Sequence, residues 1–265
     1  MHNHISSLQN QAVKRMFQLQ EKSRLRTKEG VFMLEGKREF MLAIQGGYEL
    51  EAIYIQPDLF SVQEFKKEYP QLTLINPITI SVEVYKKLAY RDSTEGILAI
   101  VRTKNTSLDE LRLSKNPLLL VAEAPEKPGN IGALLRTADA AKVDAVLIAN
   151  PKTDVYNPNI IRSSVGCVFT NQVVSASAEE IHAFLIKNKI TIYSAILQEA
   201  EDYHRQDYTQ ATAIIVGTEA VGLSPIWRTA AAKPVQIPMG GVIDSLNVSV
   251  AAGILLFEAR KQRGF

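Results

Sequence analysis

The stretch that decides the fold is LLLVAEAPEKPGNIGALLR, residues 118–136. It begins with an unbroken apolar run at residues 118–122, which predicts a strand of a parallel sheet covered on both faces. A loop rich in proline and glycine follows, and a helix is expected to open at Asn130, a good N-cap residue. Alternating strand and helix patterns continue to the C-terminus. Residues 117–265 are therefore predicted to form a doubly wound α/β domain whose ligands bind beyond the carboxyl ends of its strands.

A second, smaller α/β unit is predicted upstream, over residues 29–105. Short apolar runs, such as residues 72–75, predict strands that alternate with amphipathic segments. The polar residues 106–116 are interpreted as the linker to the larger domain. Residues 1–28 are predicted to be a basic helical segment, with its main helix over residues 7–20.

Length and composition exclude several classes of protein. The chain has 265 residues, of which 46% are hydrophobic and 22% charged, which is too apolar for a disordered chain. No apolar run approaches the roughly 20 residues that span a bilayer, and no secretory signal is visible. The single cysteine, Cys167, excludes an internal disulfide and fits a reducing compartment, and the four histidines cannot complete a zinc cage with it. The composition therefore predicts a cytoplasmic protein without a membrane segment or a metal site.

Basic residues are concentrated near the N-terminus. The net charge of the whole chain is only +2, but residues 1–40 hold eight Lys or Arg and four Glu. Such a local excess of positive charge can meet phosphates while the whole protein stays near neutral. Arg24, Arg26 and Lys28 are the candidate RNA contacts in this segment, and a solvated helix face is the alternative interpretation.

Familiar nucleotide and hydrolase motifs are missing: the sequence has no P-loop, no dinucleotide-binding glycine motif and no nucleophile elbow. Unusual residues gather instead where two further predicted strands end. In IVGTEAVGLS, residues 215–224, a buried strand ends at Gly217, and Glu219 is placed for binding or catalysis. A tight turn with a solvated glutamate is the alternative. Ser224 is expected to cap a short helix that begins at Pro225.

The third junction, IPMGGVIDSLNVSVAA at residues 237–252, runs from a strand into a final helix predicted over residues 247–262. Ser245, Asn247 and Ser249 crowd polar groups around the N-terminus of that helix. A cap needs only one of them, so the cluster favours a ligand site that uses the free amides and the positive end of the helix dipole.

Taken together, the three junctions resemble the SpoU (TrmH) family of RNA ribose methyltransferases, within the SPOUT superfamily. The matching segments occur in the family's order: NIGALLR at 130–136, GTEAVGLS at 217–224, IPM at 237–239 and SLNVSVA at 245–251. RSSVG at 162–166 looks like the family's intervening segment, and residues 29–102 look like the small RNA-binding domain that often precedes it. Lys142 and Ala220 depart from the pattern, because each stands where a glycine is usual.

The resemblance implies a C-terminal domain threaded as a deep trefoil knot, with S-adenosylmethionine as cofactor. The residues implied to hold the cofactor are Gly217, Ile237, Met239, Ser245, Leu246 and Asn130. The implied reaction is attack of a ribose 2′-hydroxyl on the cofactor's methyl group, which needs no metal. Arg136 would be the catalytic base or, because an arginine normally stays protonated, an electrostatic clamp. Glu219, Asn247 and Ser249 would position the reactants.

The resemblance also implies two partners. One is RNA, with ribosomal RNA favoured over transfer RNA, and Arg162 would be a further RNA contact. The other is a second copy of the chain, joined through the knot region. Alternatives stay open: a tRNA 2′-O-methyltransferase, a non-catalytic RNA-binding protein on the same fold, or a small-molecule methyltransferase. The basic N-terminal residues and the extra domain disfavour the last, because a small substrate would need neither.

Overall fold

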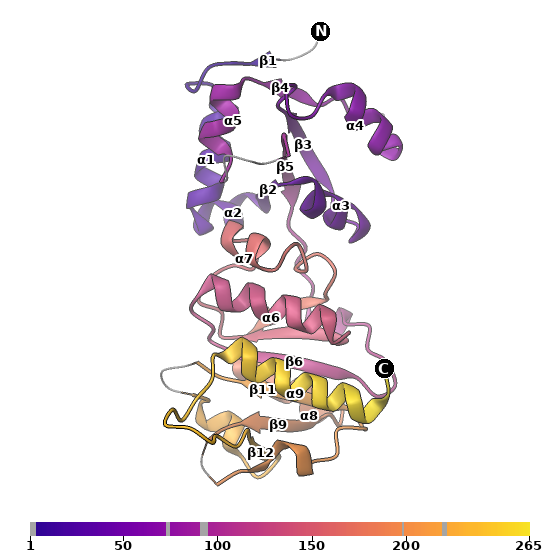
Figure 1. Ribbon diagram of the computed structural model, residues 1–265, viewed down its shortest axis with the longest axis vertical. Coiled ribbons are helices and arrows are strands. Elements are labelled where there is room, and N and C mark those ends of the chain that lie inside the picture. The colour runs from indigo at the N-terminus through magenta and orange to yellow at the C-terminus, as the bar shows by residue number, and fades with distance from the viewer. Residues whose placement is uncertain (1–3, 73–74, 91–94, 198, 219–221) are drawn as a thin grey trace. The chain divides into compact units, whose positions relative to one another are not determined.

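The computed structural model describes residues 4–72, 75–90, 95–197, 199–218 and 222–265. They form two compact units, coloured from indigo to yellow along the chain in Figure 1. The first unit comprises Met1–Lys104 together with Tyr156–Arg162, and the second comprises Asn105–Val155 together with Ser163–Phe265. The chain therefore leaves the second unit once, contributes a short segment to the first, and returns.

The first unit is built around a five-stranded mixed sheet with the strand order β1-β4-β3-β5-β2. Strand β5 runs antiparallel to both β3 and β2, whereas β4 is parallel to β3 and β1. The strands are β1 (His4–Ile5), β2 (Val31–Glu35), β3 (Leu50–Ile55), β4 (Ile78–Ile80) and β5 (Ile97–Arg102). The helices are α1 (Gln11–Glu21), α2 (Ser23–Glu29), α3 (Lys37–Gln45), α4 (Val62–Glu68), α5 (Val82–Leu88) and α7 (Pro158–Ser163), of which only the last residue belongs to the second unit.

Local interactions set the element boundaries in this unit. The Asn10 side chain accepts a hydrogen bond from the Ala12 amide at 2.8 Å, so α1 begins at Gln11 rather than at residue 7. Of the strand predicted over residues 72–75, only the two ends are described, and neither Leu72 nor Ile75 belongs to a strand. Pro70–Leu72 forms a 3-10 turn, residues 73 and 74 lie outside the described part, and the strand that pairs with β3 is β4, beyond Pro77.

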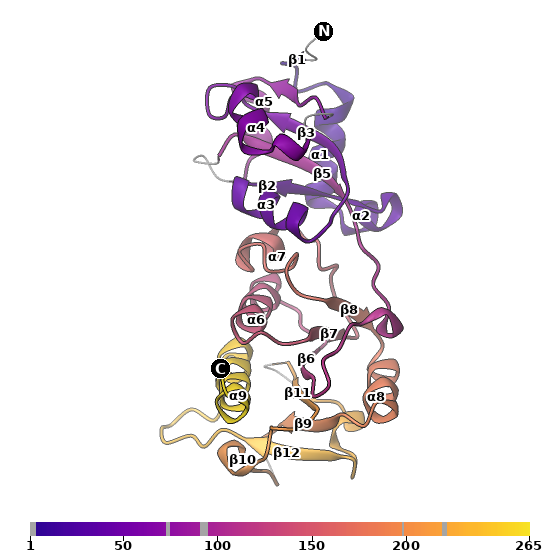
Figure 2. The same ribbon diagram turned by 90° about the vertical axis from the view of Figure 1, so that its right-hand side faces the viewer.

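The second unit is built around a seven-stranded sheet with the order β10-β12-β9-β11-β6-β7-β8, in which every strand pair is parallel. Helices α6 and α9 lie on one face of this sheet and α8 lies on the other (Figure 2). The predicted parallel-sheet α/β domain is thus confirmed. Its strands are β6 (Leu118–Glu123), β7 (Ala145–Ala149), β8 (Val173–Ala176), β9 (Thr191–Ala195), β10 (Glu201–Asp202), β11 (Thr212–Val216) and β12 (Ala232–Gln236). Its helices are α6 (Pro128–Ala140), α8 (Ala178–Lys187) and α9 (Val248–Arg263).

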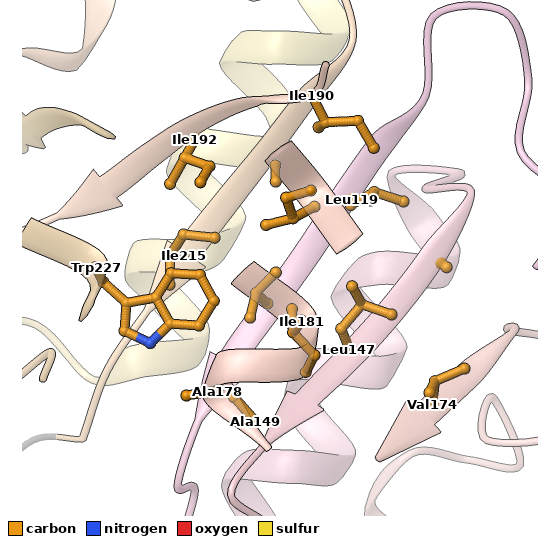
Figure 3. Packing of buried hydrophobic residues seen from close by; sticks show 14 of the residues in the cluster. Leu119, Leu147, Ala149, Val174, Ala178, Ile181, Ile190, Ile192, Ile215 and Trp227 are labelled. Carbon is orange, nitrogen blue, oxygen red and sulfur yellow. The ribbon is translucent and has the colours of Figure 1, made fainter. Parts of the chain in front are cut away.

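A core of aliphatic residues joins the central strands to α8 (Figure 3). Leu119 of β6, Leu147 of β7 and Ile215 of β11 are fully buried beneath Ile181 of α8. Because helices cover both faces of the sheet, every residue of β6 is buried, which explains its unbroken apolar sequence. Full burial of one such side chain contributes roughly 1.5–3 kcal/mol.

Residues 106–116, which were expected to be a linker, are instead packed onto the second unit. The amides of Arg112 and Ser114 donate hydrogen bonds to the side chains of Gln172 and Asp144 at 2.9 and 2.7 Å. Leucine side chains from this stretch cover the edge of the core. The linker was predicted from the polar composition of this stretch, but its three leucines are spaced two or three residues apart and pack against the core: Leu108, Leu111 and Leu113.

The strand order determines where the three junctions meet. Strand β11 lies between β6 and β9, and β12 pairs with the other side of β9. Since all these strands are parallel, their carboxyl ends lie along one edge of the sheet. The loops that follow β6, β11 and β12 therefore leave the sheet on the same side, where ligands bind in folds of this class.

Candidate active site

A cavity of about 400 Å³ lies at this edge of the second unit. Its walls come from the ends of β9, β11 and β12 and from the loop that leads into α9. The structure brings together five of the six residues predicted to contact the cofactor: Gly217, Ile237, Met239, Ser245 and Leu246. The volume falls within the range of about 300–1,000 Å³ that is usual for small-molecule sites.

The loop after β11 folds back tightly on itself. The Gly222 amide donates a hydrogen bond to the Thr218 carbonyl at 3.0 Å, and a Cβ atom at Gly217 would lie only 2.5 Å from the Gly222 carbonyl carbon and oxygen. Gly217 is thus required for the close approach of two backbone segments. Gly222 has φ +67°, a conformation that favours glycine. Glu219 and Ala220 lie outside the described residues.

Glu123 fixes the far end of this loop. The side chain, 5% exposed at the end of β6, accepts hydrogen bonds from the Ser224 amide at 2.8 Å and from the Ser224 hydroxyl at 2.5 Å. Ser224 was expected to cap the next helix, but its hydroxyl is bound to Glu123 and makes no capping bond to the 3-10 turn Pro225–Arg228. This role of Glu123 was not predicted from the sequence. The available signal was a carboxylate that ends an otherwise apolar strand.

Polar side chains at the start of α9 form a chain of hydrogen bonds that reaches α6. Asn247 caps α9: its side-chain oxygen accepts from the Ser249 amide at 3.0 Å and from the Ser249 hydroxyl at 2.6 Å. The Asn247 amide group donates to the side-chain oxygen of Asn130 at 3.2 Å. Ser245 takes no part in this chain, because its hydroxyl donates to Asp244 at 3.2 Å.

Asn130 does not cap α6, contrary to expectation. The helix begins two residues earlier, at Pro128, because proline is well suited to a first helical position, and Lys127 occupies the cap. Asn130 therefore lies in the first turn of α6 and lines a smaller cavity of about 110 Å³. Its walls include Gly217 and Val248, which also line the larger cavity, so Asn130 is adjacent to the site.

Arg136 is exposed and lines neither cavity, although it was expected beside the strand ends. It lies six residues beyond Asn130, which is about 9 Å farther along α6 at 1.5 Å per residue. It makes no hydrogen bond or ion pair with the described residues. Its charge does reach Cys167: burial raises the pKa of that thiol, the neighbouring Asp139 raises the pKa further, and Arg136 opposes the rise.

Gly132 allows α6 to pack closely against Ser163, at the end of α7, and against Ser164, which follows it. A Cβ atom at Gly132 would lie 1.9 Å from the Ser163 hydroxyl oxygen and 2.7 Å from the Ser164 backbone nitrogen. The glycine of the first motif is therefore a packing residue, and its contact surface is the serine pair of the RSSVG segment. No side chain larger than hydrogen fits between them.

The predicted RNA contacts separate into two groups. Arg26 is only 2% exposed, and its guanidinium donates hydrogen bonds to the backbone carbonyls of Leu19 and Gln20 at 2.6 and 3.0 Å. The expectation that it contacts RNA is corrected, because Arg26 joins α2 to the end of α1. Arg24 and Lys28 are exposed on α2, whereas Arg162 is half-buried on α7.

Among the described residues, neither a cluster of metal ligands nor a membrane-spanning helix is found. No group of three or more His, Cys, Asp or Glu side chains is arranged to hold a metal ion. No helix in the described ranges combines the length and the apolar character that crossing a membrane requires.

Two family models match the chain. The model of the SpoU rRNA Methylase family matches residues 117–257, which covers the second unit from β6 into α9. The model of the MRM3-like substrate binding domain matches residues 10–99 of the first unit.

Individual proteins resemble the chain over nearly its whole length. The 23S rRNA (guanosine(2553)-2′-O)-methyltransferase RlmP of Bacillus subtilis is 27% identical over 97% of this chain and 98% of its own. A crystal structure of an RNA 2′-O ribose methyltransferase is 37% identical, with a TM-score of 0.83 over 98% of this chain and 99% of that one. The SpoU methyltransferase AviRb from Streptomyces viridochromogenes, in complex with the cofactor AdoMet, is 27% identical, with a TM-score of 0.88 over 96% and 98%. The chain therefore belongs to the SpoU rRNA methylase family, as its three junctions predicted.

Proposed function

We propose that this protein transfers a methyl group from S-adenosylmethionine to a ribose 2′-hydroxyl of ribosomal RNA. The observation that carries the proposal is the cavity of about 400 Å³ at which the loops after β9, β11 and β12 converge. Membership of the SpoU rRNA methylase family supports this reaction, as does similarity to RlmP, which is named as an rRNA 2′-O-methyltransferase. Similarity to AviRb, whose structure is a complex with AdoMet, supports the cofactor.

The chemistry of the cavity fits this cofactor. Apolar side chains from Ile237, Met239 and Leu246 offer surface to an adenosine moiety, and backbone groups beside Gly217 and Gln236 offer hydrogen-bonding partners. S-adenosylmethionine would supply an electrophilic methyl group whose transfer leaves a neutral thioether. A metal ion is consequently unnecessary in this proposal.

Arg136 is the residue proposed to act on the ribose hydroxyl or its neighbouring phosphate. A planar guanidinium binds two oxygens at once and stabilises negative charge as the hydroxyl loses its proton. Asn247 and Ser249, linked to Asn130 by hydrogen bonds, would position the reacting groups, with Glu219 as the fourth member of the predicted set.

The distance of Arg136 from the cavity of its own chain supports a dimer in which each subunit completes the site of the other. Helix α9 and the loop before it expose apolar side chains that a partner would cover: Ile243 is 66% exposed, Val250 50% and Phe257 40%. The proposed interface is thus the knot region, comprising the loops around the cavity and α9, with the chain threaded as the family's trefoil knot.

Arg24, Lys28 and Arg162 are the proposed contacts of the RNA backbone or bases. Ribosomal RNA is favoured over transfer RNA because RlmP, which matches over 98% of its length, is named for a 23S rRNA nucleotide. The proposed compartment is the cytoplasm, where the single cysteine Cys167 would stay reduced.

Two measurements test the function. Isothermal calorimetry should show one S-adenosylmethionine site per chain. Mapping of ribose methylation across total cellular RNA, with and without the gene, should show one ribosomal position that loses its methyl group. Cofactor binding without any lost methylation site, and without methyl transfer to purified ribosomal RNA, would leave a non-catalytic RNA-binding protein as the better account.

A further inference from the structure

The first unit contains a cavity of its own, with a volume of about 310 Å³. It is lined by the end of β2, the start of α3, Tyr90, Glu95 and α7. Met33 and Ile161 provide apolar wall, and the remaining lining is largely polar or aromatic. All of its lining residues belong to the first unit. The volume is at the lower end of the range for small-molecule sites.

One wall of this cavity is a flat aromatic surface. The guanidinium carbon of Arg162 lies 3.9 Å from the centroid of the Tyr90 ring, which is the geometry of a cation–π stack. Tyr90 is nevertheless 55% exposed, and the Glu35 carboxylate accepts a hydrogen bond from its amide at 2.9 Å, which holds its backbone in place. An exposed ring beside a planar guanidinium is the kind of surface on which unpaired bases stack.

Another wall of the cavity is acidic: at the start of α3, the buried carboxylate of Glu39 lines it. Glu39 is 9% exposed, and one of its oxygens, Oε1, accepts from Arg38 at 3.0 Å. The other oxygen, Oε2, makes no hydrogen bond with the residues that the structure describes. It lies beside Gly36, where a Cβ atom would come within 2.6 Å of it. Since a carboxylate only accepts hydrogen bonds, this oxygen can accept one from a ligand in the cavity.

We propose that this cavity binds one unpaired guanine base of the RNA substrate, stacked against Tyr90 with its donor edge toward Glu39. Three carboxylates line the cavity against two guanidiniums, so its charge does not favour a phosphate: Glu35, Glu39 and Glu95 oppose Arg38 and Arg162. Among the four bases, only guanine places a ring N–H and an amino group side by side, which matches the two acceptor oxygens of a carboxylate. The assignment rests on the proposed function in taking RNA as the ligand.

A neighbouring cavity provides room for the strand on one side of that base. It has a volume of about 430 Å³ and shares Gln20, Tyr90 and Pro158 with the first, so Tyr90 lies between the two. Lys87, whose ammonium lies 4.7 Å from the Phe17 ring centroid, lines this second cavity and offers a positive charge to a phosphate. One base in the acidic cavity and the adjoining backbone in the basic one would be a two-nucleotide site.

The test is binding of short RNA to the full-length protein, followed by fluorescence anisotropy. Fluorescein-labelled UUGUU is the probe, and unlabelled UUGUU, UUIUU and UUAUU compete, where I is inosine. We expect UUGUU to compete about tenfold better than the other two, because inosine lacks the amino group and adenine lacks both adjacent donors. Tyr90→Ala should weaken binding of the probe about tenfold, within the range for loss of one base stack, and Tyr90→Phe should not weaken it.

Variants of the acidic groups separate base recognition from general RNA affinity. Glu39→Gln should abolish the preference for guanine, whereas Glu83→Gln, an exposed glutamate of α5 outside both cavities, should leave it unchanged. Unaltered cofactor affinity and melting temperature would show that the variants are folded. Equal competition by the three pentanucleotides, or a guanine preference that survives Glu39→Gln, would overturn the proposal.

The same preparations distinguish this proposal from the proposed function. If wild-type protein methylates ribosomal RNA but binds the three pentanucleotides equally, the guanine site is wrong and the function stands. If the protein prefers UUGUU but never transfers a methyl group, the guanine site stands and the proposed reaction is wrong. Repeating the competition in EDTA shows whether a divalent cation occupies the acidic cavity. Loss of the guanine preference in EDTA would also overturn direct recognition by the Glu39 carboxylate.

Discussion

Glu123 accepts hydrogen bonds from both the backbone amide and the hydroxyl of Ser224, which stands 101 residues later in the chain. The pair joins the end of β6, where Glu123 lies, to Ser224, which follows the loop after β11. The carboxylate is nearly inaccessible, so water does not compete for the two bonds. The loop that borders the cavity of about 400 Å³ is therefore held by a buried carboxyl group that does not itself line this cavity.

We expect Glu123→Gln to lower the free energy of unfolding by about 1.5–3 kcal/mol, the usual contribution of a hydrogen bond to a charged group. Ser224→Ala, which removes only the hydroxyl, should cost less. Both variants should weaken S-adenosylmethionine binding, and Glu123→Gln, the less stable of the two, should weaken it more than Ser224→Ala. Denaturant unfolding and calorimetry would measure the two effects, and a Glu123→Gln protein of wild-type stability would show that the pair is unimportant.

Gly217→Ala should abolish cofactor binding, because its Cβ would lie 2.5 Å from the Gly222 backbone and would force the loop open. Gly240→Ala is the matched control: it lies in the loop before α9, and nothing comes within 4 Å of its Cβ position. Calorimetric titration with S-adenosylmethionine should thus separate the two alanine variants. Equal affinities for both would remove the Gly217 turn from the binding site.

Arg136→Ala and Arg136→Lys should each lower single-turnover methyl transfer about 10²-fold or more, because lysine lacks the planar fork that can hold two oxygens. Affinity for S-adenosylmethionine should stay unchanged, since Arg136 does not line the cavity. Arg205→Ala, another exposed arginine of the second unit, is the control. Near-normal turnover in Arg136→Ala would direct attention to Asn247 and Ser249.

Mixing two inactive variants tests whether Arg136 acts on the partner's cofactor. In a heterodimer of Arg136→Ala with Gly217→Ala, one site has both an intact cofactor loop and an intact arginine from the other subunit. After subunit exchange at equal concentrations, half of the dimers would be mixed, so activity should recover to about a quarter of wild type. An arginine acting within its own chain would give no recovery.

Lys142→Gly should stabilise the protein by about 1 kcal/mol. Lys142 follows α6 with φ +50°, a left-handed conformation that costs an ordinary L-residue roughly 1–2 kcal/mol and glycine almost nothing. Its carbonyl accepts from Arg260, a bond that glycine would keep. Lys187→Gly, at the last position of α8, should destabilise the protein instead. Thermal unfolding of both variants would decide, and a lower melting temperature for Lys142→Gly would contradict the argument.

Glu180 gives one pH-dependent contribution. Its carboxylate accepts from the amide and hydroxyl of Ser177 in the capping box of α8, and these hydrogen bonds lower its pKa. A group with a lowered folded pKa stabilises the protein above its unfolded value, about 4.3 for glutamate, and loses that effect as the pH falls through the folded pKa. The stability difference between wild type and Glu180→Gln should accordingly be constant near pH 7 and shrink below about pH 4. A difference independent of pH down to 3 would contradict this assignment.

Sequence patterns predicted the features that depend on a few neighbouring residues. The apolar run of β6 predicted a buried parallel strand, and the buried strand predicted to end at Gly217 is β11, which ends at Val216. Lys142 was singled out because glycine is usual there, and the structure shows the positive φ that explains this preference. Asn247 was one of three candidates to cap α9, and its contact with Ser249 identified it as the cap.

Features that depend on distant partners could not be predicted in this way. Arg26 has the spacing of a surface residue, and only the position of the last turn of α1 makes it a buried donor to the Leu19 carbonyl. Arg136 was placed at the strand ends by its distance from Asn130 in the sequence, but α6 carries it away from that edge. The role of Glu123 required knowledge of where Ser224 lies, 101 residues farther on.

Three peptide connections join the two units, because Tyr156–Arg162 belongs to the first although both of its neighbours in the chain belong to the second. The Tyr156 ring stacks on Phe32 with centroids 4.5 Å apart, and its hydroxyl accepts from the Lys104 amide and donates to the Lys104 carbonyl, both at 3.0 Å. Deletion of residues 1–105 would not leave an intact second unit, because Tyr156 would lose its aromatic partner Phe32. Exchange of the first unit between relatives by recombination at a single point meets the same obstacle. The small unit and the segment from Tyr156 to Arg162 must consequently be inherited, and engineered, together.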